Sequence, residues 1–390
     1  MNQRRIEEVC SQLIRYIEKE EYRGYDPYDT LNSPLPFGLI GKWGKPIAIQ
    51  IQKRNPLNIR PFIGIKKGYN PKAMGLFLQA YSLRYQRTQE ADLLPKMDWL
   101  FNWLIENYTE GYSGYCWGYN FDWASSVKLL PAYSPTIVVS CFVAKGIREY
   151  YAATKKPRAL EVLESIATFL DRDLEKTEDQ DGICISYSTI EPDCCYNASM
   201  LGAELFAFLY SETKEERYRE LALKASRFVV KKQQEDGRWN YSINLETGKE
   251  REQIDFHQGY VLDSLAYVMQ YISEAKQEFE SAWQKGTDFS AQNQFVSGRA
   301  LYRYPSVWPV DIHNQAQGII SFSRWKRKSD DLNLARSIVE YSSQKMRASQ
   351  GYFYYKKYPW VTIKTPFIRW GQGWMFLALE EYLKAQASVE

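Results

Sequence analysis

The chain contains only two histidines, and both lie in segments of the same form. His257 stands in Asp-Phe-His-Gln-Gly and His313 in Asp-Ile-His-Asn-Gln, so each follows an aspartate by two residues and opens an apolar stretch. A histidine can take or give a proton near neutral pH, and a nearby carboxylate can fix its tautomer. The paired pattern therefore predicts proton transfer by both histidines at one site. Two alternatives stay open, because each aspartate is also suited to cap a helix and each histidine could be structural.

Tyrosine, arginine and tryptophan side chains are frequent in and around these segments. A Tyr or His base, with an arginine that neutralises a carboxylate, is suited to remove the acidic C5 proton of a uronic acid, which leads to epimerisation or β-elimination. A structural role in hairpins is the alternative for each tyrosine. The predicted catalytic residues are His257, His313, Asp311, Asp122, Tyr119, Tyr304 and Tyr355. The predicted substrate-binding residues are Tyr115, Trp117, Asn197, Arg303, Asn314, Gln317, Arg369, Trp370 and Gln372.

Other chemistries are compatible with parts of this pattern. Glycoside hydrolysis needs two carboxylates beside the scissile bond, and Asp122 and Asp311 would then be the acid and the base. A protein that binds glycans without catalysis is a further alternative. The six cysteines lack a C-x-x-C spacing, so we expect no metal site and no other cofactor. The run QQEDGRW at 233–239 resembles a repeat motif of terpene cyclases, but their acidic motifs are missing, which favours a structural role.

The residues named above fall at recurring positions along the chain. Polar or aromatic residues open an apolar helix near residues 70, 134, 194, 255, 311 and 368, about 55 to 65 residues apart, and such a period indicates an array of repeats. Amphipathic helices are expected between them at about 91–108, 156–175, 215–234, 276–293 and 331–347. Residues 1–19 are expected to form the sixth of these amphipathic helices. Connections with glycine followed by alternating aromatic residues predict short hairpins.

Six helical hairpins of this length predict an all-α fold, a closed (α/α)6 toroid of residues 1–390 with short β-hairpins at one rim. An open α-solenoid is the alternative, although it would leave polar caps at both ends. A closed ring gathers the starts of its inner helices at one mouth, where a ligand site is expected. The Gly- and Pro-rich stretch 22–68 is expected to be a long ordered loop over that site.

Composition narrows the function classes. The net charge is +3, from 50 basic and 47 acidic residues without a basic stripe, so nucleic acid is not an expected partner. Thirty tyrosines raise the aromatic share to 15%, and we expect most aromatics in the core and those at the mouth to stack on sugar rings. The polar first helix resembles neither a signal peptide nor a membrane span, which predicts a cytoplasmic protein with reduced, mostly buried cysteines.

Several strings resemble a bacterial family of polysaccharide-biosynthesis proteins from capsule and exopolysaccharide gene clusters. They are NPKAMGLFLQAY, GYSGYCWGYNFDW, DFHQGYVLDSL, WPVDIHNQAQGI and GYFYYKKYPWVTIKTPFIRWGQGWMFLAL. The likeness covers residues 60–385 and implies an oligosaccharide or polysaccharide partner, free or attached to a lipid or nucleotide. More distantly, the chain is similar to heparosan-glucuronate C5-epimerases and six-hairpin glycosidases. Relatives carry V-H-N-A-N where this chain has Cys195-Tyr196-Asn197-Ala198-Ser199, so a mechanism with three histidines is not expected.

Overall fold

The structure is a computed structural model that describes residues 1–124, 129–325 and 329–388. Its centre is a ring of six inner helices, each of which packs against the next. The ring closes because the last inner helix packs against the first. This confirms the predicted toroid and excludes the open solenoid. The inner helices are α3 (Pro71–Thr88), α5 (Ile137–Thr154), α7 (Tyr196–Thr213), α9 (His257–Tyr271), α11 (Ile312–Trp325) and α13 (Trp374–Ala387).

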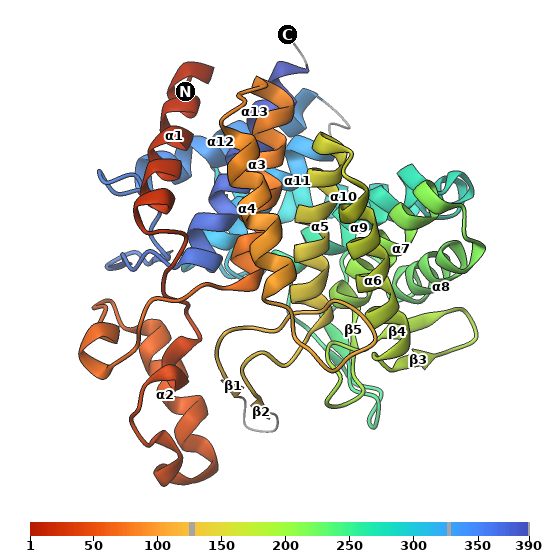
Figure 1. The fold of residues 1–390 in the computed structure, drawn as a ribbon, viewed down its shortest axis with the longest axis horizontal. Helices are drawn as coiled ribbons and strands as arrows, with labels where there is room; N and C mark the ends of the chain where they lie inside the picture. Colours follow the sequence, from red (N-terminus) through yellow and green to blue (C-terminus); the bar gives the residue numbers. More distant parts are fainter. Residues whose placement is uncertain (125–128, 326–328, 389–390) are drawn as a thin grey trace.

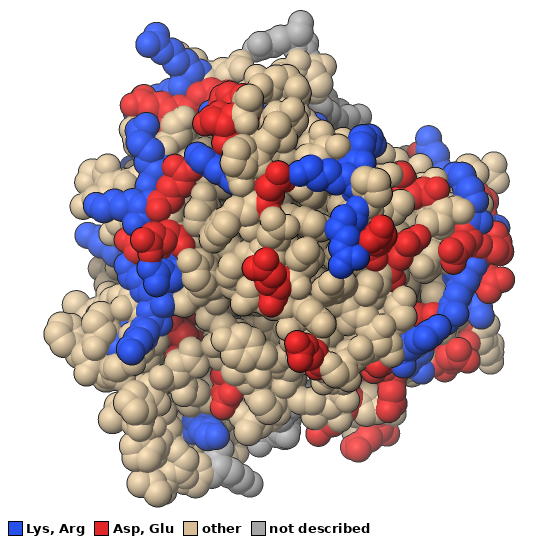
Figure 2. Space-filling view, in the orientation of Figure 1, with Lys and Arg blue, Asp and Glu red and all other residues tan. Residues whose placement is uncertain are grey.

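A second layer of helices surrounds the ring (Figure 1). These outer helices bury one apolar stripe and expose a polar one, whereas the inner helices are buried on nearly every face. Lys and Arg are interspersed with Asp and Glu over the face shown in Figure 2. No helix in the described ranges has both the length and the apolar character to cross a bilayer. The outer helices are α1 (Gln3–Lys19), α4 (Leu93–Glu106), α6 (Pro157–Arg172), α8 (Glu216–Val230), α10 (Ser273–Asn293) and α12 (Ser329–Lys345).

Five of the connections leading to an inner helix contain a glycine that lies against an outer helix. A Cβ atom at these positions would lie only 1.9–2.6 Å from a helix carbonyl oxygen, so no larger residue fits there. The fifth of these carbonyls belongs to Gln12 of α1, which shows that the first helix completes the outer layer. The glycines are Gly114, Gly182, Gly237, Gly298 and Gly351, and they face Ser165, Lys224, Lys285, Ser337 and Gln12 in that order.

The predicted hairpins are present as short antiparallel strands. Two of the sheets have three strands, in the orders β5-β6-β7 and β10-β11-β12, and β5 and β10 lead directly into inner helices. The strands are β1 (Trp123–Ala124), β2 (Leu129–Leu130), β3 (Lys176–Glu178), β4 (Ile183–Ile185), β5 (Cys194–Cys195), β6 (Ser242–Ile243), β7 (Glu250–Arg251), β8 (Phe295–Val296), β9 (Arg299–Ala300), β10 (Val310–Asp311), β11 (Lys356–Lys357) and β12 (Thr362–Ile363).

Residues 22–68, predicted to be a long loop, include four short helices. In Figure 1 they make a lobe at the lower left that extends from the ring. A buried ion pair between Arg60 and Asp29, with Nε and Oδ1 2.7 Å apart, holds the lobe together. Pro46 lies in the first turn of α2, where a missing N–H costs little. The elements are η1 (Asp29–Asn32), η2 (Phe37–Trp43), α2 (Gly44–Arg54) and η3 (Arg60–Ile63).

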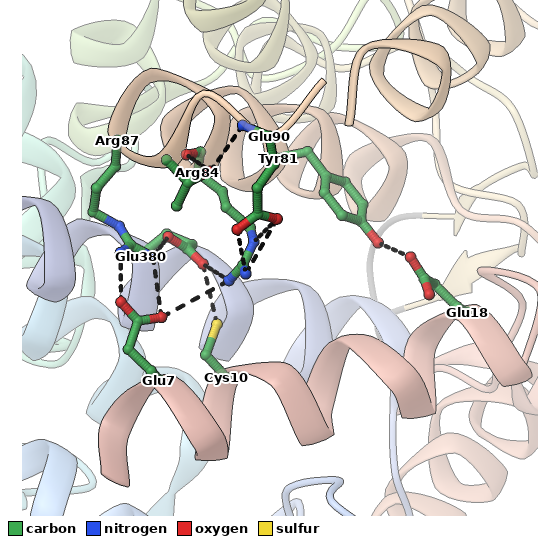
Figure 3. A network of polar contacts seen from close by, with 9 residues as sticks. Glu7, Cys10, Glu18, Tyr81, Arg84, Arg87, Glu90 and Glu380 are labelled. Atoms are coloured by element: carbon green, nitrogen blue, oxygen red, sulfur yellow. Dashed lines mark hydrogen bonds and ion pairs between the residues drawn. The ribbon is translucent and has the colours of Figure 1, made fainter. Parts of the chain in front are cut away.

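A polar network joins the first and last hairpins of the ring (Figure 3). Its centre is Glu380 of α13, whose side chain is fully buried. Its carboxylate accepts hydrogen bonds from Arg84 Nη1 (3.2 Å) and Arg87 Nη2 (2.9 Å) of α3. The Cys10 thiol of α1 lies 3.3 Å away, so α1, α3 and α13 meet on one carboxylate. All six cysteines are buried free thiols.

Candidate active site at the mouth of the ring

Asp255 and His257 form a hydrogen-bonded pair at the start of α9. Asp255 Oδ1 lies 2.5 Å from His257 Nδ1 and also accepts the His257 backbone N–H at 3.1 Å. The aspartate therefore caps the helix and orients the imidazole at once, which leaves Nε2 as the nitrogen available for proton transfer. Burial alone would raise the pKa of Asp255, but the charge and hydrogen bonds of His257 lower it. The His257 side chain keeps 16% of its surface exposed.

His313 has the same relation to Asp311 but different surroundings. Its backbone N–H donates to Asp311 Oδ1 at 3.0 Å, whereas its ring Nε2 lies 2.7 Å from the Tyr260 hydroxyl. The ring is 1% exposed and lies against Trp374, with the two centroids 4.4 Å apart. Burial, with the charge of Lys72 next, lowers the pKa of His313 well below its usual value. His313 is therefore a neutral hydrogen-bonding residue at neutral pH.

The structure brings the two histidines together through Phe256. The Phe256 ring centroid lies 4.0 Å from that of His257 and 4.1 Å from that of His313. Tyr260 also contacts both rings, at centroid distances of 5.6 Å and 6.1 Å. The two imidazoles therefore share one aromatic site at the inner-helix starts.

Asp311 is held by two side-chain donors, Lys356 and Trp370, besides capping α11. It lies in β10 opposite Lys356 of β11, and the Lys356 Nζ is 3.1 Å from Oδ2. Trp370 donates its indole N–H to Oδ1 at 2.8 Å. Lys356 also reaches the Tyr302 hydroxyl at 3.5 Å. A carboxylate with so many partners is better suited to position neighbouring groups than to act as a free base.

Lys72 lies in the first turn of α3 and points into a set of aromatic rings. Its Nζ is 3.9 Å from the centroid of Phe142, 5.3 Å from that of Trp374 and 5.7 Å from that of Tyr260. The residue is 3% exposed, and in the described part of the chain no carboxylate lies within ion-pair distance of it. Burial lowers the pKa of Lys72 well below its usual value. A bound anion would stabilise its charged form.

The 22–68 lobe contacts one side of the mouth. Lys53 of α2 hydrogen-bonds to the Tyr28 hydroxyl, and its Nζ lies 4.0 Å from the Tyr28 ring centroid and 5.7 Å from that of Trp370. Burial, followed by the charge of Lys356, lowers the pKa of Lys53 to about 7. Lys53, Tyr28 and Lys72 were not predicted from the sequence as site residues. For Lys53 and Tyr28 the only indication was the unusual length of the segment between α1 and α3, since long segments are often functional.

Arg369 does not present a free guanidinium. It lies in a π-helical turn, η4 (Ile368–Gly373), and binds Asp26 of the lobe through Nε at 2.6 Å and Nη2 at 2.8 Å. Its guanidinium also lies 4.8 Å from the Tyr119 ring centroid. Burial raises the pKa of Tyr119. Arg369 and Tyr119 therefore join the lobe to the ring, and Arg369 can hold a substrate carboxylate only if Asp26 moves.

Three aromatic residues predicted for the site pack elsewhere. Trp117 is fully buried, and its indole N–H donates to the Leu104 carbonyl of α4 at 3.0 Å, so it fills the core. The Tyr115 hydroxyl accepts a hydrogen bond from Arg158 of α6 at 3.0 Å. The Tyr304 ring packs against Phe289 of α10, with centroids 5.4 Å apart. These contacts with outer helices give all three a structural role.

Three further residues predicted to be functional are Asp122, Arg303 and Tyr355, and they have different surroundings. Asp122 accepts the Ala132 backbone N–H at 2.8 Å and so stabilises the β1–β2 hairpin. Arg303 is exposed and contacts the Tyr302 ring at 5.6 Å. Tyr355 is 1% exposed and lies beneath the Lys356 ammonium, which is 4.7 Å from its ring centroid.

The predicted amide side chains hydrogen-bond to other groups of the protein. Gln372 accepts the Phe353 N–H and donates to the Phe353 carbonyl, both at 2.8 Å. Asn314 donates to the Leu301 carbonyl at 2.8 Å, and Gln317 to Asp263 at 2.8 Å. Asn197 accepts the Cys195 thiol at 3.0 Å. Sequence position alone suggested substrate binding for these residues, whereas their partners give them structural roles.

The described residues contain no group of three or more His, Cys, Asp or Glu side chains arranged to hold a metal ion. A small cavity of about 20 Å³ lies between α9, α10 and α11 and is lined by Asp255, Asn314 and Gln317 among others. It has room for roughly one water molecule. The chemistry available at the mouth is therefore that of an oriented histidine, a neutral His–Tyr pair, several aromatic rings and a lysine that has no ion-pair partner among the described residues.

No protein-family model matches the sequence, and no curated protein is similar to it at a significant level. Solved structures share its architecture. Cellobiose 2-epimerase from Bacillus thermoamylovorans superposes with a TM-score of 0.61 and 13% identity over 80% of this chain and 88% of that chain. The GH76 α-mannanase of Bacteroides thetaiotaomicron gives 0.61 and 14% over 80% and 86%. An unsaturated glucuronyl hydrolase specific for heparin gives 0.63 and 12% over 99% and 97%. Identities this low show a common fold.

Proposed function

We propose that this protein is a carbohydrate-active enzyme that acts on a uronate-containing glycan by removing and returning a carbon-bound proton. The observation that carries the proposal is the Asp255–His257 pair, with Oδ1 and Nδ1 2.5 Å apart, beside the aromatic site that also holds His313. Solved structures with this fold include sugar epimerases and a hydrolase specific for heparin, which supports a sugar substrate.

His257 acts as the base in this proposal. Asp255 holds Nδ1, so the basic lone pair is at Nε2, and the partly exposed imidazole can reach a bound sugar. The proton at C5 of a uronate is acidic because the electron pair left behind is shared with the adjacent carboxylate. Lys72 stabilises that charge, since no carboxylate of the described protein neutralises it.

Tyr260 and His313 contact the Phe256 ring, as His257 does. The Tyr260 hydroxyl is the hydrogen-bond donor of this pair. Burial keeps the pKa of Tyr260 well above its usual value, so its hydroxyl stays protonated. Return of a proton from this side gives the C5 epimer, whereas loss of the substituent at C4 gives an unsaturated sugar. Trp370, whose ring is partly exposed, is placed to stack on the sugar.

Hydrolysis is the second candidate, because a GH76 α-mannanase shares the fold. It would need a pair of available carboxylates, and the contacts described above are less favourable to it. Asp311 is bound to Lys356 and Trp370, and Asp122 stabilises a hairpin. The third candidate function is glycan binding without catalysis. The resemblance to capsule and exopolysaccharide proteins supports a cytoplasmic role in surface-polysaccharide synthesis on a lipid- or nucleotide-linked glycan.

The test is incubation of the protein with uronate-containing glycans in deuterated water. Deuterium at C5 of the recovered sugar and its epimer, seen by mass spectrometry and proton NMR, is the expected result; a product with a C4–C5 double bond, which carries no hydrogen at C5, would establish β-elimination instead. New reducing ends without deuterium would establish hydrolysis instead. Binding of the glycan with neither change, in both the native protein and His257→Ala, would establish a binding protein.

A further inference from the structure

The lobe of residues 22–68 exposes a row of large apolar side chains. Leu39, Trp43, Ile47 and Ile51 recur at every fourth position along η2 and α2 and are 84%, 51%, 50% and 65% exposed. Phe62 adds a side chain that is 88% exposed. A shallow open groove runs along α2 between Trp43, Ile47 and Ile51. In Figure 2 the lobe, at the lower left, is largely tan. Contiguous apolar surface of this kind marks an interaction site.

The charged side chains of the same segment are almost all basic. No Asp or Glu occurs between Asp29 and Glu90, whereas Lys and Arg are frequent there. Arg54 and Lys66 are exposed, and Lys45 is partly exposed. The outer side of the lobe is therefore apolar and basic, while its inner side contacts the mouth through Lys53 and Tyr28.

We propose that the apolar, basic face of α2 and η2 binds the surface of a bilayer that contains anionic phospholipids. Helices with this combination lie in the plane of the lipid interface, with apolar side chains among the acyl chains and Lys or Arg at the headgroups. The lobe extends from the ring, as Figure 1 shows, which suits contact with a broad, soft surface. A second copy of the chain docked on this face would bring basic segments against each other, which disfavours self-association.

Binding in this way places the mouth of the ring near the lipid surface, because the lobe contacts one side of that mouth through Lys53 and Tyr28. Glycans attached to a lipid would then be within reach of His257. That consequence depends on the proposed function, whereas lipid binding itself does not. The two are tested separately, since lipid binding can be measured without a sugar substrate and deuterium exchange can be measured on free glycans without vesicles.

The experiment is co-sedimentation of the full chain with phosphatidylglycerol–phosphatidylcholine vesicles and with vesicles of phosphatidylcholine alone. We expect at least tenfold tighter binding to the anionic vesicles, weakened by added salt. The double variant Ile47→Ser/Ile51→Ser should lose binding at least tenfold, because two inserted side chains are removed. Lys45→Gln/Arg54→Gln should lose about fivefold for each charge. Trp360→Ser is the matched control, since Trp360 is 82% exposed on the β11–β12 hairpin, and it should bind as the native protein does.

Equal binding to both kinds of vesicle, or no binding to either, overturns the proposal. So does native-like binding by Ile47→Ser/Ile51→Ser when circular dichroism shows it folded. Sedimentation velocity without lipid measures the oligomeric state of the native protein and of the variant. A native dimer that Ile47→Ser/Ile51→Ser converts to a monomer would identify a second copy as the occupant of this face, and the lipid proposal would be withdrawn.

Discussion

Glu204 and Lys72 are both buried charged residues of inner helices, yet their surroundings differ. The Glu204 carboxylate accepts hydrogen bonds from Lys145, from Arg148 at 2.7 Å and from Ser264 at 2.8 Å, so helices α5, α7 and α9 meet on it. Lys72, at the mouth, has aromatic rings around its ammonium group and no such partner among the described residues. Buried charges that satisfy one another hold a fold together, whereas a buried charge without a partner is a candidate for ligand binding.

The middle and later turns of the other inner helices follow the pattern of Glu204. Asp263 of α9 accepts Ser321 Oγ at 2.9 Å and Trp325 Nε1 at 2.8 Å from α11. Arg324 of α11 donates to Glu381 of α13 at 2.9 Å, and Glu380 joins α13 to α3. These networks form a belt around the ring. Substitutions in the belt should therefore affect stability, and substitutions at the mouth should affect activity.

The largest effect is expected at His257. Removal of the base in His257→Ala should lower the rate of C5 deuterium exchange by about a thousandfold, the usual contribution of a general base. The melting temperature should fall only modestly, because Asp255 keeps its hydrogen bonds from the Gln253 amide and from the backbone N–H of residue 257. Glu246→Ala, an exposed change in the same connection, is the control and should keep full activity. A His257→Ala rate within tenfold of the native rate would remove this residue from the mechanism.

Glu204→Gln should give the opposite result. Loss of the carboxylate leaves Lys145 buried without a counterion and leaves Arg148 paired with Glu149 alone, which should cost about 3 kcal/mol of unfolding free energy while the folded fraction keeps its activity. Burial would raise the pKa of Glu204, but Lys145 and Arg148 lower it to about 2. Its stabilisation is therefore complete above pH 4.5 and is lost as the pH falls toward 2. Denaturant unfolding of both proteins across this range should show the difference shrinking; a constant difference would contradict the ion-pair account.

Lys72→Met tests whether an unpaired cation serves the substrate. We expect KM for a uronate glycan to rise about thirtyfold, equivalent to ~2 kcal/mol for a hydrogen bond to a charged group. Stability should be unchanged or higher, because burial lowers the pKa of Lys72 and no ion pair is lost. Steady-state kinetics with a uronate glycan and with its carboxyl-reduced form make the comparison. An equal rise in KM for both substrates would show that Lys72 does not bind the carboxylate.

The sequence predicts the ring well because its evidence is repeated. Apolar helix starts recur at a nearly constant period, and the paired Asp-x-His segments fall at equivalent places. It predicts individual roles less well. Gln372 and Gln258 each bond to a backbone group 19 residues upstream, Phe353 and Trp239 respectively, and nothing in the local pattern distinguishes such a structural glutamine from a ligand-binding one.

The aromatic residues show the same limit. Trp117 and Trp239 both follow a glycine in a connection, where stacking on sugar was a reasonable expectation for Trp117. Each instead donates its indole N–H to a carbonyl of the preceding outer helix, Leu104 or Val229, at 3.0 Å and 2.8 Å. Lys53 was missed for another reason. It lies in a lobe without a repeat equivalent, and its position over the mouth depends on tertiary packing that the sequence pattern does not encode.

Lys53→Met should have the smallest effect. Whether it raises or lowers the free energy of unfolding shows whether Lys53 resembles Lys72 of the mouth or the paired charges of the belt. Burial lowers the pKa of Lys53 from 10.5 to about 7, so the folded state binds fewer protons than the unfolded state between these values. The cost of the buried charge is therefore complete below pH 7 and disappears as the pH rises toward 10.5. We expect Lys53→Met to be more stable than the native protein by about 1 kcal/mol below pH 7, a figure reduced because Lys53 is partly exposed. Urea unfolding at several pH values measures the difference. Greater stability of the native protein below pH 7 would mean that Lys53 belongs with the paired charges of the belt.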